Sequence, residues 1–267
     1  MSEPPWMQPW RDAVARGAER YMDPATGYMV FTEAVHRRRG TCCGGACRHC
    51  PFGHEAVRAA ARPLRTHAPT LLMRGPSTGT HTDVVFWSGG KDAWLAYRAV
   101  TAEGRKTVWL TTFDPETRRL PLQEIPVETI AEQAERAGTS LILVPVGPGL
   151  PYVESVMTAL DVVHRRWPVD RLVFGDLWLE DVRAAREASL GPWCRARGAT
   201  LHFPLWGTSP DELVGRVEKA GAVVTITAST HPSVAVGDAW SRGWLAGLPS
   251  DVDPFGERGE FHTLVTW

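Results

Sequence analysis

The chain has 267 residues, 43% of them hydrophobic, so it can bury the core of one large domain or of one medium domain with a small appendage. No apolar run approaches the roughly 20 residues of a membrane-spanning helix, and the first ten residues lack the charged and apolar regions of a signal peptide. We therefore expect a cytoplasmic protein with no membrane partner.

Charge is unevenly distributed along the chain. The formal net charge is −1, yet residues 1–75 hold 11 arginines and 6 acidic residues, including three consecutive arginines at 37–39. A basic segment of this kind can bind the phosphates of a nucleic acid, although most such segments are solvated surfaces. RNA is therefore one candidate partner.

Strand and helix patterns alternate over most of the chain. Glycines and prolines punctuate residues 63–81, which predicts a linker after an N-terminal module of residues 1–62. Apolar segments of strand length follow at 83–87, 107–113, 141–146, 171–175 and 201–205. Helical patterns lie between them at 91–103, 127–137, 151–166 and 180–197. This order predicts an α/β fold with a parallel sheet, which binds ligands at the carboxyl ends of its strands.

The first of these strands ends in the sequence SGGKD, and a helix is expected to begin at once. Paired glycines let the backbone turn tightly and approach an anion, and the amides at a helix N-terminus point toward that anion. A lysine adds a full positive charge, and the following aspartate can position a metal ion or the loop itself. The pattern predicts a phosphate-binding loop formed by Ser88, Gly89, Gly90, Lys91 and Asp92.

This segment resembles the PP-loop of the ATP pyrophosphatases, SGGxDS, with Ala93 in place of the last serine. Three further segments resemble the diphthine–ammonia ligase-related branch of that superfamily, also called adenine nucleotide alpha hydrolase-like: EQAE with Gly138, GDLWLEDVR at 175–183 and DPFGERGEFHT at 253–263. The likeness covers about residues 82–267. It implies a Rossmann-like domain of the HUP type that binds ATP at 82–206 and a C-terminal subdomain on the substrate side at 207–267.

The resemblance implies an ATP-dependent ligase that adenylates an acceptor, releases pyrophosphate and transfers ammonia. The acceptor can be a small molecule, a protein or an RNA. Three acids that follow a strand, Asp176, Glu180 and Asp181, could bind Mg²⁺ or a cationic substrate, or could simply favour a helix N-terminus. Glu260 and His262 lie two residues apart, so an extended chain places them on one face, where they could orient a nucleophile or carry its proton.

Four of the five cysteines lie within nine residues: Cys42, Cys43, Cys47 and Cys50. Residues 21–52 resemble a small family of uncharacterised cysteine-motif domains. The cysteine spacing fits a zinc site or an iron–sulfur cluster, with His49 or His54 as a further candidate ligand. A redox-active thiol pair is the next interpretation, and free thiols are the remaining one. Cys194 is expected to be a buried apolar residue.

Two other functions stay open at this point. One is ATP-dependent sulfur transfer, such as thiolation of tRNA, in which the cysteine module would carry the sulfur. The other is a nucleotide-binding sensor without turnover, which Ala93 makes conceivable because it removes one hydroxyl from the phosphate loop.

Overall fold

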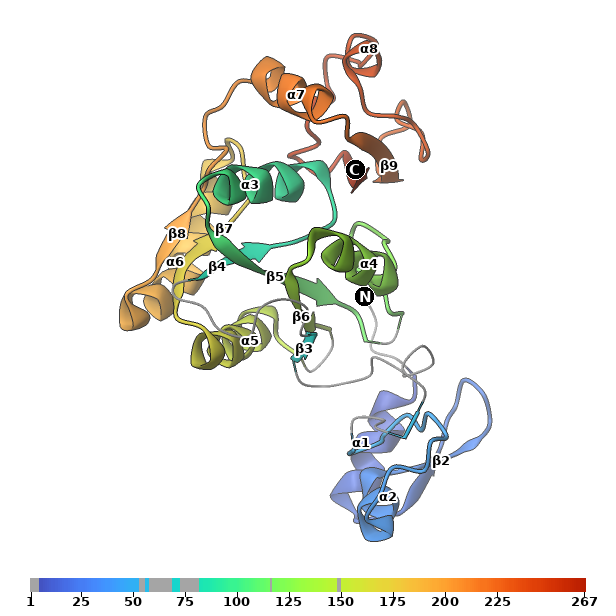
Figure 1. Ribbon diagram of the computed structural model, residues 1–267. Coiled ribbons are helices and arrows are strands. Elements are labelled where there is room, and N and C mark those ends of the chain that lie inside the picture. Colours follow the sequence, from blue (N-terminus) through green and yellow to red (C-terminus); the bar gives the residue numbers. More distant parts are fainter. Residues whose placement is uncertain (1–4, 53–55, 58–68, 73–81, 116, 148–149) are drawn as a thin grey trace. The chain divides into compact units, whose positions relative to one another are not determined.

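The computed structural model describes residues 5–52, 56–57, 69–72, 82–115, 117–147 and 150–267. The chain divides into two compact units, residues 1–67 and 68–267 (Figure 1). Residues 207–267, predicted as a C-terminal subdomain, belong to the second unit, and most of the predicted linker lies outside the described residues. His54 lies outside them as well.

The second unit is built on a six-stranded sheet of order β3-β6-β5-β4-β7-β8. All neighbouring strands are parallel except β3, which runs antiparallel to β6. This confirms the predicted α/β fold and its Rossmann-like character. The strand β3 shows that part of the stretch 63–81 joins the sheet. The strands are β3 (Thr70–Leu72), β4 (Thr82–Phe86), β5 (Lys106–Phe113), β6 (Ser140–Pro145), β7 (Val169–Val173) and β8 (Thr200–His202).

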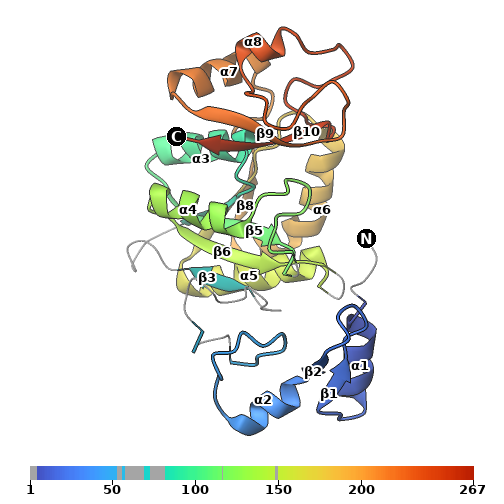
Figure 2. The same cartoon turned by 90° about the vertical axis from the view of Figure 1, so that its right-hand side faces the viewer.

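Four helices cover the two faces of this sheet (Figures 1 and 2). They are α3 (Lys91–Ala102), α4 (Val127–Ala137), α5 (Tyr152–Arg166) and α6 (Glu180–Arg197), and each bound lies within one residue of the predicted one. Alternate residues of a strand face opposite sides of the sheet. Val84 accordingly joins the core under α5 and α6. Directly after β4, the Trp87 ring stacks on the Trp109 ring of β5 with centroids 3.5 Å apart.

The chain runs outward from β4 to β5 and β6, returns to the other side of β4, and continues through β7 to β8. The carboxyl ends of β4 and β7 therefore flank the point at which the strand order reverses. Doubly wound sheets bind their ligands in the crevice at such a point. The loop at 88–92, which joins β4 to α3, lies at this edge of the sheet.

The last part of the chain packs on α3. It consists of α7 (Pro210–Lys219), β9 (Val223–Ser229), α8 (Arg242–Leu245) and β10 (Phe261–Thr266). Strands β9 and β10 form an antiparallel pair, and both α7 and β10 contact α3. The Val265 amide donates a hydrogen bond of 2.9 Å to the Gly89 carbonyl. The backbone of β10 is thus joined to the loop that follows β4.

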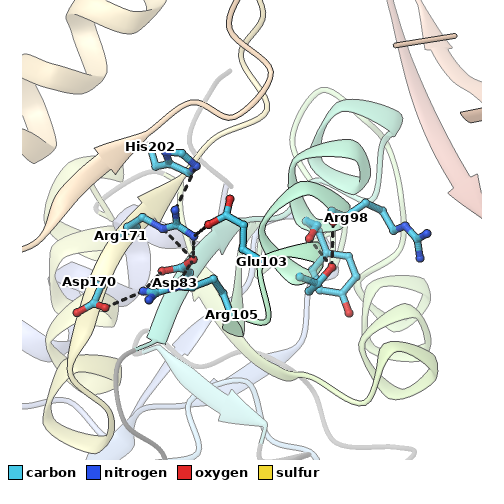
Figure 3. A network of polar contacts seen from close by, with 9 residues as sticks. Asp83, Arg98, Glu103, Arg105, Asp170, Arg171 and His202 are labelled. Atoms are coloured by element: carbon cyan, nitrogen blue, oxygen red, sulfur yellow. Dashed lines mark hydrogen bonds and ion pairs between the residues drawn. The ribbon is translucent and has the colours of Figure 1, made fainter. Parts of the chain in front are cut away.

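A buried charge network holds the opposite end of β4 (Figure 3). Asp83 is 0% exposed and accepts hydrogen bonds from Arg105 at 2.8 Å and from Arg171 at 2.6 Å. Arg105 also binds Asp170 at 2.6 Å, and Arg171 binds Glu103 at 2.9 Å. Because the two guanidinium groups share one buried carboxylate, this network joins the amino ends of β4 and β7 to the start of β5.

The first unit is small. It contains α1 (Met7–Ala15), a hairpin of β1 (Arg20–Met22) and β2 (Met29–Phe31), and α2 (Glu33–Arg39). Its apolar cluster includes Trp6, Met7, Ala13 and Tyr21. Across the described parts of both units, no helix is long and apolar enough to cross a membrane.

Candidate functional site

Close contacts with other parts of the protein require the small size of Gly89 and Gly90, the two glycines after β4. Gly89 has a φ of +80°, and a Cβ there would lie 2.7 Å from the Ile130 side chain. A Cβ at Gly90 would lie 3.0 Å from the Thr263 carbonyl oxygen. The Gly90 amide donates to the Ser88 hydroxyl, and the Lys91 amide donates to the Thr263 hydroxyl. In the structure these glycines allow β10 and α4 to approach the loop, and their predicted contact with an anion stays a prediction.

Gln133 on α4 stabilises the same loop. It is buried, accepts a hydrogen bond from the Trp87 indole at 2.9 Å and donates to the carbonyls of Gly89 and Val265 at 3.3 and 2.8 Å. One amide side chain therefore bonds to the end of β4, the loop after it and β10. The sequence comparison included this residue in a motif but gave it no role.

Lys91 is only 2% exposed, although the sequence predicts that it faces a phosphate. Its ammonium group donates to the Phe255 carbonyl at 2.6 Å and pairs with Asp92 at 3.0 Å. The rings of Trp240, Phe255 and Phe261 lie around it, with centroids 5.1 to 5.7 Å from Nζ. Lys91 thus holds the segment around Phe255 against the start of α3.

Three carboxyl groups meet at this edge of the sheet: Asp92, Asp176 and Glu257. Burial raises the pKa of Asp92, against the opposing effect of Lys91, and the charge of Asp176 raises it further. Burial and the charge of Asp92 raise the pKa of Glu257 to about 7, although the Leu177 amide donates to its carboxylate. Asp176 is bound by both nitrogens of the Arg186 fork.

This group of charges favours a cation. Two positive charges, Lys91 and Arg186, face the three carboxyl groups, and the Asp92 Oδ1 atom is buried without a hydrogen-bond partner among the described residues. Mg²⁺ in nucleotide enzymes commonly uses one or two carboxylates together with substrate phosphates. Asp92 and Glu257 fit that donor set. Glu257 is absent from the sequence-based site, although its place after Phe-Gly in the motif at 253–263 was the signal available.

Glu260 and His262 have different surroundings in the structure. The Glu260 carboxylate accepts hydrogen bonds from the amides of Asp253 at 2.9 Å and Arg258 at 3.1 Å, and so closes the loop before β10. His262 is half-buried, and burial together with the charge of Lys91 lowers its pKa. Its imidazole is therefore neutral near pH 7 and can accept a proton.

The remaining acids predicted for the site, Glu180 and Asp181, have exposed side chains in the first turn of α6. Negative charge is favourable at that end of a helix, which accounts for both residues without a ligand. The structure therefore brings together the loop at 88–92, Asp176 and His262. It adds Glu257 to them.

The four clustered cysteines lie as two pairs in the first unit. The Sγ atoms of Cys43 and Cys47 are 3.3 Å apart, and those of Cys42 and Cys50 are 3.8 Å apart. His49 is buried, with its Nε2 atom 2.9 Å from the Tyr21 hydroxyl. Within the described ranges, no three His, Cys, Asp or Glu side chains are grouped as metal ligands. Zinc or iron–sulfur binding thus stays a prediction. Cys194 is buried in α6, as expected.

Comparison with known proteins finds a family match in the N-terminal part of the chain. Residues 10–56 match the model of the Family of unknown function (DUF5522). A chain described as a predicted subunit of a tRNA methyltransferase from Methanocaldococcus jannaschii is similar in structure, with 15% sequence identity and a TM-score of 0.39. The match covers 70% of this chain and 97% of that one. A likeness at this level carries no argument about function.

Proposed function

We propose that the second unit binds ATP with Mg²⁺ at the carboxyl ends of β4 and β7 and uses it to activate an acceptor as an adenylate. The observation that carries the proposal is the place of the loop at 88–92. This loop starts α3 at the reversal point of a doubly wound sheet. It lies next to the Oδ1 atom of Asp92, which has no hydrogen-bond partner in the part of the chain that the structure describes. The resemblance of the loop and of the segment 253–263 to the ATP pyrophosphatases gives the reaction class.

Asp92 and Glu257 would hold the metal ion, which would neutralise phosphate charge and polarise the bond between the α and β phosphates. The first turn of α3 carries the positive end of the helix dipole, which would attract the phosphates, while the Lys91 amide itself donates to the Thr263 hydroxyl. Lys91 keeps the Phe255 segment in place through its carbonyl contact, and the Ser88 hydroxyl supports the turn. Asp176 is held by Arg186, and its negative charge raises the pKa of Asp92.

His262 would accept a proton at its imidazole from the incoming nucleophile, since burial and Lys91 keep the ring neutral. Ammonia would then displace AMP and make the protein a ligase that forms a C–N bond. Sulfur as the nucleophile would lead to thiolation instead. The acceptor is a small molecule, a protein or an RNA with an oxygen that can be adenylated.

ATP binding is the first test, because it needs no acceptor. Titration calorimetry of the full chain with ATP should show binding that requires Mg²⁺, and Asp92→Asn should weaken it at least tenfold. The matched control is Glu187→Gln on the exposed side of α6, where the carboxylate pairs with Arg183. Equal affinity of the Asp92 variant and the native chain would refute the site.

The products separate the reaction classes. With fractionated acceptors and ammonium, ATP should give AMP and pyrophosphate. Formation of ADP and phosphate would contradict adenylation, and Mg²⁺-dependent binding without AMP in any fraction would identify a sensor.

A further inference from the structure

Among the described residues, the cysteine pairs of the first unit are the reactive groups that the proposed ATP chemistry does not use. We propose that Cys43 and Cys47 form a dithiol that exchanges with small anionic disulfides. Their Sγ atoms lie 3.3 Å apart, against 3.8 Å for Cys42 and Cys50. A disulfide has an S–S length of roughly 2.05 Å, so the first pair needs an approach of about 1.2 Å to close.

The two thiols of this pair differ in the way that exchange requires. Cys43 is exposed, whereas Cys47 is partly buried. Thiolate is the attacking species, and the exposed Cys43 is the sulfur that an incoming disulfide can reach first. Cys47, at 3.3 Å from it, is placed to complete the exchange in the second step.

The chain segments that carry Cys43 and Cys47 differ in how firmly they are held. Arg48, which follows Cys47, bonds to the Tyr21 hydroxyl at 3.0 Å and to Asp23 at 2.8 Å. His49 stacks on Trp10 with ring centroids 5.2 Å apart. Cys47 is therefore carried by a segment fixed to α1 and β1. Closure of the pair would come from the chain on the Cys43 side.

That chain is a tight turn with left-handed backbone at two residues. Gly44 has a φ of +73°, and a Cβ there would lie 3.2 Å from the Ala56 carbonyl oxygen. Ala46 has a φ of +50°, a conformation that residues with a Cβ rarely adopt. Strained residues of this kind are characteristic of sites where the chain holds a reactive geometry.

The surroundings indicate the charge of the disulfide. The last turn of α2, directly before the cysteines, carries His36, Arg37, Arg38 and Arg39. Arg38 is paired with Glu19, whereas Arg39 contributes to the field at Cys43. A disulfide that carries carboxylates, such as oxidised glutathione, would be attracted to this turn, and a cationic disulfide would be repelled.

The exchange balances in two steps. The Cys43 thiolate attacks one sulfur of R–S–S–R, the substrate S–S bond breaks, and RS⁻ leaves and takes up a proton. The Cys47 thiol then loses its proton and attacks the Cys43 sulfur, which releases the second thiol. The products are one Cys43–Cys47 disulfide and two RSH. Two electrons pass from the protein to the substrate.

The test uses the full chain, reduced and then incubated with oxidised glutathione, followed by alkylation and peptide mass spectrometry. The expected product is a Cys43–Cys47 link with the loss of two free thiols. Cys47→Ser should accumulate glutathione on Cys43, and Cys43→Ser should abolish the reaction. Cys194→Ser is the control for a buried thiol outside the pair and should react as the native chain does.

Further measurements keep the proposal open to refutation. Cystamine, a cationic disulfide, should react at least tenfold more slowly than oxidised glutathione, and equal rates would overturn the assignment of charge. A link between Cys42 and Cys50, or scrambled links, would overturn the choice of pair. Stoichiometric zinc or iron in the purified chain, with all four thiols protected until chelation, would overturn the dithiol in favour of a metal site. If serine variants fail to fold by circular dichroism, Ala46→Gly, which relieves the strained backbone, must still close the native pair.

Discussion

Replacement of Lys91 by methionine tests whether this lysine acts mainly as an internal anchor. The change keeps the length of an apolar side chain but removes the ammonium group that binds Asp92 and the Phe255 carbonyl. Removal of one partner of a buried ion pair costs about 3–5 kcal/mol, and an unsatisfied buried carbonyl adds roughly 1–3 kcal/mol. Asp92 can recover part of this cost by taking up a proton. We expect a net loss of about 3 kcal/mol at pH 7.

The assay is urea unfolding of the full chain, followed by tryptophan fluorescence and circular dichroism. The pKa of Asp92 is already raised by burial, and without Lys91 it should rise further. A carboxyl group with a raised pKa stabilises the folded state at low pH and loses that contribution as pH increases. The loss caused by Lys91→Met should therefore be smaller near pH 4.5 than at pH 7.5.

A double variant supplies the control. Lys91→Met with Asp92→Asn removes the charge that would be left unpaired, so it should cost less than Lys91→Met alone. A loss below about 1 kcal/mol for the single variant, together with no recovery in the double one, would refute the anchor. Lys91 would then be available for a phosphate, as the sequence predicts.

Three other predictions concern stability. Gly89→Ala should cost at least about 1 kcal/mol more than Gly138→Ala in urea unfolding, because both residues have a positive φ but only Gly89 lacks space for a Cβ; equal costs would contradict the packing role. Glu257→Gln should flatten the decline in stability between pH 5 and pH 8. A carboxyl pKa raised to about 7 contributes up to about 3 kcal/mol of stability, which is lost as pH rises through that value. An unchanged dependence of stability on pH would show that the Glu257 carboxyl group is solvated. Asp83→Asn should cost about 3 kcal/mol in thermal unfolding and Glu103→Gln, with its carboxylate 47% exposed, less than about 1 kcal/mol; similar costs would show that the burial of Asp83 is unimportant.

The sequence was sufficient for the five parallel strands of the sheet and for the place of the loop at 88–92, but not for β3, which lies in the stretch predicted as a linker. Strand and helix patterns are local, so the bounds of α4 and α6 agree with the predicted ones. Such local patterns do not predict that Lys91 is buried, because its partner Phe255 lies 164 residues away in the chain. Glycine patterns likewise do not distinguish a loop that leaves room for a ligand from one that leaves room for β10.

The cysteines show the same division between local and spatial information. Their spacing predicted that the four thiols lie close together. The two Sγ–Sγ distances, within the pair Cys43 and Cys47 and within the pair Cys42 and Cys50, depend on the turn around Gly44 and on the fixed segment that carries Cys47. Glu257 was missed because its significance comes from burial beside Asp92, which belongs to a different part of the chain.

The hydrogen bond from the Lys91 amide to the Thr263 hydroxyl can form only late in the synthesis of the protein. These residues are 172 positions apart, so the loop at 88–92 and the strand β10, which packs against it, leave the ribosome at different times. At about 5–20 residues per second, that interval lasts roughly 10 to 30 s. Throughout it the lysine and the turn beside it have no Thr263 or Phe255 to bind. The loop at 88–92 can therefore acquire its contacts with β10 only after that strand has been synthesised.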